Sequence, residues 1–106
     1  MAQRGEFGPE DAPIIGVARW EPGKGGGVRE IPPDTCPWGH DVRPDGSMWV
    51  GWHHGHSLRM YTCRACYQAG GGGYWCVQKD ERAMWQAHLD GGGTLPPGQT
   101  IDSLVR

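Results

Sequence analysis

The sequence has little of what builds an ordinary hydrophobic core. Its 106 residues include no asparagine and one phenylalanine, whereas tryptophan occurs six times. Glycine (19 residues) and proline (9 residues) make up about a quarter of the chain, a level at which disorder competes with folding. The apolar side chains that could form a core are therefore mostly aromatic, and they lie between Trp38 and Leu89. A core of that size is marginal, so we expect disulfides or a metal to stabilise it.

The sequence also lacks a long apolar run and a strong charge imbalance. No stretch is long enough to span a bilayer, and the start, MAQRGEFGPEDAP, has no secretory signal pattern. We therefore expect a cytoplasmic protein, in which a CxxC pair is more often a metal or redox site than a disulfide. The net charge of −2 argues against a protein built as a strong nucleic-acid binder.

Stretches rich in glycine and proline suggest boundaries along the chain. We expect four parts: a flexible N-terminal arm (1–35), a central domain that contains all four cysteines (36–78), a short helix docking on that domain (79–90) and a flexible C-terminal tail (91–106). Within the first arm, IIGVARW at 14–20 is either a short strand or a docking peptide. Asp80 is the expected N-cap of the helix, and Gly91 is its expected stop.

The middle of the chain has the pattern of an antiparallel hairpin followed by a third strand. SMWVGW and SLRMYTC have strand composition and flank the reversal HHGH, and YWCV follows a run of four glycines that we interpret as a flexible hinge. The predicted segments are a turn at 43–47, strands at 47–52 and 57–63, a hinge at 70–73 and a strand at 74–77. The fold class predicted is thus a small, metal-stabilised, β-rich domain with a short helix and flexible arms.

All four cysteines lie in two short segments, TCPWGH and YTCRACYQAGGGGYWC. Cys63 and Cys66 have the CxxC spacing that brings two thiolates to one ion, and Zn²⁺ prefers four such ligands in a tetrahedron. Cys36 and His40 offer the other two ligands, because Pro37 stiffens the intervening turn and glycine lets it close. The 22 residues between His40 and Cys63 leave room for the hairpin. The sequence predicts one structural Zn²⁺ per chain, held by these four side chains at the base of the hairpin, so residues 36–78 are expected to form a zinc ribbon.

Other uses of the cysteines stay open at this point. Cys76 could replace His40 in a four-thiolate site for zinc or an iron–sulfur cluster, or it could be a buried spare on the third strand. A histidine of HHGH could also replace His40, although that turn is expected at the far end of the hairpin. Two disulfides, or a thioredoxin-like CxxC, are further alternatives.

The two cysteine-containing segments carry a family resemblance. CPWGH followed by RMYTCRAC is similar to the CxxGH…R…CRxC zinc ribbon of small actinobacterial and phage proteins, including ribbons beside HNH endonuclease domains. The similarity covers Cys36 to Cys66 and includes Arg59 and Arg64. It implies the same four ligands, Cys36, His40, Cys63 and Cys66, and says little about function.

The residues outside the four candidate ligands are compatible with three functions. An HNH-like nuclease could use His53 and His54 with Asp41 or Asp45, but the chain has no asparagine, and a four-ligand zinc would be closed. A protein adaptor whose arms order on a partner is the second alternative. We expect a non-catalytic module that binds nucleic acid or a nucleic-acid-processing complex, without a membrane or a small-molecule substrate. The expected contact residues are Arg43, Trp49, Trp52, His53, His54, His56, Arg59 and Arg64.

Overall fold

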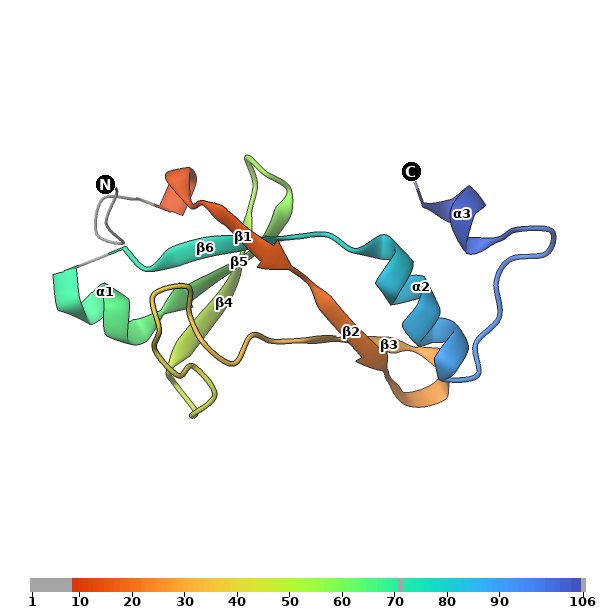
Figure 1. The fold of residues 1–106 in the computed structure, drawn as a ribbon, viewed down its shortest axis with the longest axis horizontal. Coiled ribbons are helices and arrows are strands. Elements are labelled where there is room, and N and C mark those ends of the chain that lie inside the picture. The colour runs from red at the N-terminus through yellow and green to blue at the C-terminus, as the bar shows by residue number, and fades with distance from the viewer. Residues whose placement is uncertain (1–8, 71, 106) are drawn as a thin grey trace. The chain divides into compact units, whose positions relative to one another are not determined.

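The computed structural model describes residues 9–70 and 72–105 (Figure 1). The chain folds into two units. The first unit comprises Met1–Gly16 and Pro33–Gln78, and the second comprises Val17–Pro32 and Lys79–Arg106. The start of the expected N-terminal arm, the hinge residue Gly71 and the last residue, Arg106, lie outside the described residues. We expected boundaries at 35/36 and 78/79, with each part a single continuous segment. Each unit of the structure instead combines two separate segments of the chain.

The first unit contains a four-stranded sheet with the strand order β1-β6-β5-β4 (Figure 1). Its strands are β1 (Ile14–Val17), β4 (Met48–His53), β5 (Leu58–Cys63) and β6 (Tyr74–Gln78). Antiparallel pairing places Val50 opposite Tyr61 and Tyr61 opposite Trp75. The predicted hairpin and third strand are therefore present. The position of β1 beside β6 was not expected, although a strand at 14–20 was one of the two alternatives considered.

Local turn chemistry explains both ends of the β4–β5 hairpin. Before β4, the predicted turn closes through a Ser47 N–H bond to the Pro44 carbonyl (3.0 Å), with Gly46 at φ 79°. Between the strands, Ser57 adopts a left-handed φ of 55°, which permits the tight reversal. After β5 the chain enters helix α1 (Arg64–Gly70). The sequence predicted only the turn of a CxxC pair and a glycine hinge in this region.

Apolar side chains pack on both faces of this sheet. On one face the fully buried Trp75 contacts Tyr61 (ring centroids 5.5 Å apart) and Trp38 (6.2 Å). On the other face Ala12, Leu58 and Cys76 form a buried cluster, against which Met60 and Tyr74 pack. We expected the tryptophans to form most of the core, and this is wrong for Trp49 and Trp52, which are 46% and 45% exposed. Small aliphatic and cysteine side chains fill that place instead.

The second unit combines a hairpin with two helices. Its elements are β2 (Arg19–Pro22), β3 (Val28–Ile31), α2 (Glu81–Asp90) and α3 (Ile101–Leu104), and α2 packs against the β2–β3 hairpin. The Asp80 side chain caps α2 by accepting from the Ala83 N–H (3.0 Å), and Gly91 follows its last turn as predicted. The helix was expected to dock on the domain at 36–78; within its own unit it packs against the hairpin made from the N-terminal segment, which was not expected.

The expectation of an arm without regular structure is thus incorrect for the hairpin region. The glycines that suggested disorder close the hairpin, because Gly25 and Gly26 adopt φ values of 62° and 81° that other residues disfavour. The Gly23 N–H donates to the Gly27 carbonyl at 2.8 Å, which completes the loop. An ion pair between Arg29 and Glu21 joins the two strands at the surface. Likewise, the expected C-terminal tail contains α3, whose first residues form a capping box.

Within the described residues, none of the helices combines the length and apolar character needed to cross a bilayer.

Candidate metal centre

The first pair of candidate ligands lies on a tight turn between β3 and β4. The Cys36 N–H donates to the His40 carbonyl at 2.8 Å, and the Gly39 N–H donates to the Cys36 carbonyl at 3.0 Å. Gly39 adopts a φ of 101°, and no atom lies within 4 Å of where its Cβ would be. The constraint at this position is therefore backbone conformation and not space. The turn also directs the His40 N–H toward the Cys36 Sγ (3.3 Å).

The second pair lies where β5 runs into α1. Cys63 is the last residue of β5, and Cys66 lies in the first turn of α1; both are fully buried. The change from strand to helix directly after Cys63 brings the two sulfur atoms to the same side of the chain. The Arg64 N–H bonds to the Ser47 carbonyl (3.0 Å) and ties the start of the helix to the turn before β4.

Gly73 completes this second segment, in a role that was not predicted. Its carbonyl accepts from the Cys63 N–H at 3.0 Å, and its φ is 82°. A Cβ at this position would lie 2.6 Å from the Cβ of Cys66 and 3.1 Å from the Cys63 carbonyl oxygen. The glycine run at 70–73 was interpreted as a flexible hinge, but one of its members is required by close approach to a candidate ligand. A glycine soon after a CxxC pair was the available signal.

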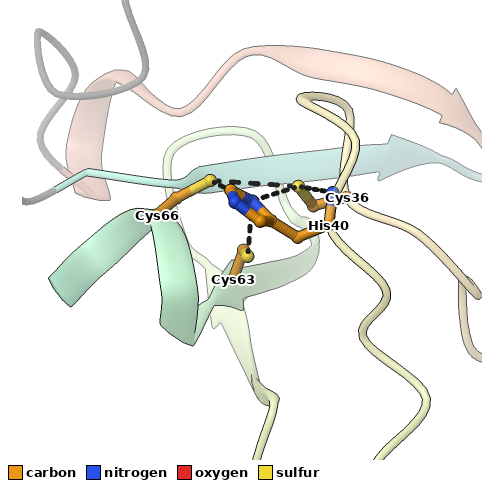
Figure 2. Close-up of side chains that lie close together, drawn as sticks. All are labelled: Cys36, His40, Cys63 and Cys66. Atoms are coloured by element: carbon orange, nitrogen blue, oxygen red, sulfur yellow. Dashed lines mark hydrogen bonds between the residues drawn. The ribbon is translucent and has the colours of Figure 1, made fainter. Parts of the chain in front are cut away.

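All four predicted ligands converge. One donor atom from each of Cys36, His40, Cys63 and Cys66 lies within 4.8 Å of every other. In Figure 2 the imidazole of His40 points into the space between the three sulfur atoms. Its Nδ1 lies 3.5, 3.7 and 3.2 Å from the Sγ atoms of Cys36, Cys63 and Cys66, in that order. These four residues lie close enough to hold one metal ion.

The spacing of the donor atoms can be compared with that of a real tetrahedral site. Zn–S bonds of about 2.3 Å and a Zn–N bond of about 2.0 Å imply S···N separations of about 3.5 Å and S···S separations of about 3.8 Å. The S···N distances bracket the first value, and the Cys36 and Cys66 sulfur atoms are 3.9 Å apart. The cluster is therefore already near the dimensions that a tetrahedral ion requires.

The thiols of the cluster differ in acidity. Burial works to raise the pKa of Cys36, but bonds from the backbone N–H groups of His40 and Trp38, followed by those from the other two thiols, bring this pKa below its ordinary value. Burial, followed by the neighbouring Cys63 and Cys36, raises the pKa of Cys66 to about 12. In the metal-free protein a thiolate therefore forms more readily at Cys36 than at Cys66. A metal ion must displace a proton from Cys66.

Cys76 lies outside the cluster. It packs with Ala12 and Leu58 in the apolar core, and burial raises the pKa of its thiol. All four cysteines are free, so the structure contains neither of the two disulfides considered as an alternative. The arrangement matches the alternative in which Cys76 is a buried apolar residue of the third strand.

The histidines of the β4–β5 turn are not part of the cluster: His54 and His56 are exposed, whereas His53 is buried. His53 is buried; its Nδ1 accepts from the His56 N–H (2.9 Å), and its Nε2–H donates to the Glu10 carbonyl (2.9 Å). The ring of His56 stacks on that of His53 with centroids 4.2 Å apart, and its Nε2 lies 3.2 Å from the Ala12 carbonyl. These two side chains hold the segment before β1 in place. Only His54 of the three lies exposed without such a bond among those described.

The other expected contact residues do not form one surface. Trp49 and Trp52 lie on opposite faces of β4, because side chains alternate along a strand. Trp49 contacts Tyr67 edge to face at 5.5 Å, and Trp52 lies opposite Arg59 on β5. Arg43 forms a two-point ion pair with Asp41, at 3.0 Å for each contact, and the Arg64 guanidinium bonds to the Gly46 carbonyl (3.3 Å). The two tryptophans are therefore presented on opposite faces of the sheet.

The residues proposed for a nuclease centre are also dispersed. Asp41 and Asp45 line a cavity of about 220 Å³ beside Cys63, and Cys63 lies opposite Met48 at the start of β4. His53 is at the other end of β4, so the length of a six-residue strand, roughly 17 Å, separates the two sets. Arg43 also holds the pKa of the Asp41 carboxyl at about 2, mainly through the hydrogen bond between their side chains. These groups do not meet around one substrate atom.

No protein-family model, curated protein or solved structure matches this chain. The metal centre is therefore defined by its own geometry.

Proposed function

We propose that Cys36, His40, Cys63 and Cys66 bind one structural Zn²⁺ per chain, in the zinc-ribbon arrangement that the resemblance to CxxGH…R…CRxC proteins implies. The observation that carries the proposal is the convergence of three sulfur atoms and one imidazole nitrogen within 4.8 Å. Three thiolates and one imidazole form a donor set that zinc prefers, whereas carboxylates and carbonyls would favour harder cations. The Zn²⁺ would link the turn at 36–40 to the end of β5 and the start of α1.

The proposed site is structural and not catalytic. A catalytic zinc keeps a position for water beside three protein ligands, whereas four protein ligands complete the tetrahedron. Three of the four residues are buried, and His40 is half-buried. Zinc binding would therefore contribute folding free energy to the first unit, and the protein would act through the surface that the folded unit presents.

The proposed role of that surface is recognition. Three aromatic side chains, Trp49, Trp52 and Tyr67, are each close to half exposed, and tryptophan and tyrosine are enriched at protein interfaces. The first unit has four basic and six acidic side chains, and three thiolates with Zn²⁺ would add one negative charge. This balance favours a protein component of a nucleic-acid-processing complex over the nucleic acid itself. The pairing of Trp52 with Arg59 is the feature that supports nucleic acid as the alternative target.

Metal analysis of the purified protein tests the zinc proposal. The wild type should contain one zinc per chain, Cys76→Ser should retain it, and His40→Ala should lose it or bind it more weakly. Retention in His40→Ala with loss in Cys76→Ser would refute the ligand assignment. Iron with visible absorbance would refute the metal.

Salt dependence separates the two kinds of target. Binding of a fluorescent single-stranded oligonucleotide should weaken as salt is added if phosphates are contacted, because each contact releases counterions. An apolar docking site for a protein should respond little to the same change. If the oligonucleotide shows no binding at low salt, nucleic acid is excluded as the direct target.

A further inference from the structure

β4 is an open edge of the sheet in the first unit. All six of its residues pair with β5 on one side, from Met48 opposite Cys63 to His53 opposite Leu58. On its other side the part of the chain that the structure describes provides no neighbouring strand. An edge strand presents a row of backbone N–H and C=O groups that only another extended chain can match in full.

This edge lacks charged side chains and proline, two features that commonly prevent strand pairing. Residues 46–58 contain no lysine, arginine, aspartate or glutamate, and β4 contains no proline. The opposite edge, β1, is shorter, and Gly16 within it adopts a φ of 83°, which interrupts the regular strand. β4 is therefore the edge that an added strand would fit.

We propose that β4 pairs antiparallel with β4 of a second copy of this chain, about a twofold axis at Val50. In this register Val50 lies opposite its own counterpart, and Met48 lies opposite Trp52 of the other copy, on the same face of the joined sheet. On the other face, Trp49 lies opposite Gly51. A twofold axis makes both halves of such an interface identical, so any complementarity is obtained twice.

The pairing of Trp49 with Gly51 is the specific evidence for this register. Trp49 is 46% exposed, and no atom of its own chain lies within 4 Å of where a Cβ on Gly51 would be. The indole of one copy therefore finds open space over the glycine of the other, a large side chain opposite a small one. On the opposite face, Val50 (57% exposed) and Trp52 (45%) would be covered at the same time.

The size of this interface indicates a weak dimer. A fully buried aromatic side chain removes about 150–250 Å² of surface from water. Trp49 and Trp52 are half exposed, so the dimer would bury roughly 100 Å² more of each. With Val50, the total is well below the roughly 800 Å² per partner of a standard interface. The absence of formal charge along the strand means that like charges on β4 do not oppose the pairing. We therefore expect association at micromolar or higher concentration.

Sedimentation velocity of the full, metal-loaded chain tests this inference. From low micromolar to several hundred micromolar, the wild type should shift from monomer to dimer, and Val50→Lys should remain a monomer because it places two like charges opposite each other. Val17→Lys is the matched control, since Val17 lies on the other edge strand with nearly the same exposure (54% against 57%). This control should dimerise as the wild type does.

Gly51→Val is the second variant, because it leaves the monomer intact. A Cβ at this position would meet no atom within 4 Å beyond its own chain neighbours, and valine favours strand conformation, so the folded unit and its metal content should be unchanged. The same side chain would occupy the space that Trp49 of the other copy needs, so dimerisation should weaken by tenfold or more. A wild type that is monomeric throughout would overturn the inference, as would dimerisation of Val50→Lys or Gly51→Val at wild-type strength. Neither result would bear on the zinc proposal, which rests on metal content.

Discussion

Replacing the sulfur atom at each of two equally buried cysteines separates metal binding from packing. Cys63 and Cys76 are both fully buried in the first unit, but only Cys63 has its sulfur atom in the candidate metal centre. Serine is nearly the same size as cysteine. We therefore predict that Cys63→Ser unfolds the first unit, whereas Cys76→Ser leaves it folded and metal-bound.

The expected magnitudes differ greatly. Cys76→Ser buries a hydroxyl between Ala12 and Leu58, which costs about 1–3 kcal/mol if the hydroxyl finds no hydrogen-bond partner. A structural zinc site contributes about 10–16 kcal/mol of apparent binding free energy in small zinc domains. Whole domains are stable by only about 5–15 kcal/mol. Weakening the site by one ligand therefore removes a large part of the stability of the first unit.

Near-ultraviolet circular dichroism with metal analysis provides the assay. Trp75 is 2% exposed and packs against Tyr61 and Trp38, so its asymmetric environment should give a strong aromatic signal in the folded unit. Helix α2 belongs to the second unit, and its far-ultraviolet signal serves as an internal reference. Cys63→Ser should lose the aromatic signal and the metal while it retains helical signal. A Cys63→Ser protein that contained no metal but kept the full aromatic signal would refute the reasoning.

Three further predictions follow from other parts of the structure. Gly73→Ala should lose most of its bound metal, because its Cβ would lie 2.6 Å from the Cβ of a ligand and its φ is left-handed, whereas Gly70→Ala, with open space around it, should retain the metal. His88→Ala should lower the unfolding free energy of the second unit by about 1–3 kcal/mol and leave the metal content unchanged. The reason is that the two ring nitrogens of His88 lie 2.5 and 2.9 Å from two backbone carbonyl oxygens. The exposed Gln86→Ala is the control, and thermal unfolding is the measurement. Burial raises the pKa of the Cys76 thiol above its ordinary 9.0, so the unfolded chain releases this proton first and the unfolding free energy falls as pH rises above about 9. Urea unfolding on both sides of that pH should show this loss in the wild type and a smaller one in Cys76→Ala; equal losses in the two proteins would contradict the assignment.

The features that the sequence predicted are those that depend on neighbouring residues. The four candidate ligands follow from two short spacings and from a hairpin long enough to bring them together. Asp80 could be recognised as a cap because a cap and the N–H group that it accepts from are three residues apart. The alternation of side chains along β4 follows from the extended backbone alone.

The features that were missed depend on residues far apart in the chain. His53 could be placed in a turn, but its bond to the carbonyl of Glu10 spans 43 residues, and no local pattern indicates it. The β2–β3 hairpin was obscured because glycine supplies both disorder and tight turns, and composition does not separate the two. The same ambiguity concealed Gly73, whose conformation matters only because Cys66 folds back against it.

The position of the ligands in the chain explains why a metal is suited to this fold. His40 and Cys63 are separated by 23 positions. Closing a loop of that length costs conformational entropy, and burial of apolar surface in a small core offsets only part of this cost. Cys36 and His40 precede the hairpin and Cys63 and Cys66 follow it, so one ion would close the loop at the base of both strands. The exposed Trp49 and Trp52 can then remain on the surface, because the sheet would not depend on burying them. A metal at this position would thus allow these two side chains to lie outside the core, where a partner could contact them.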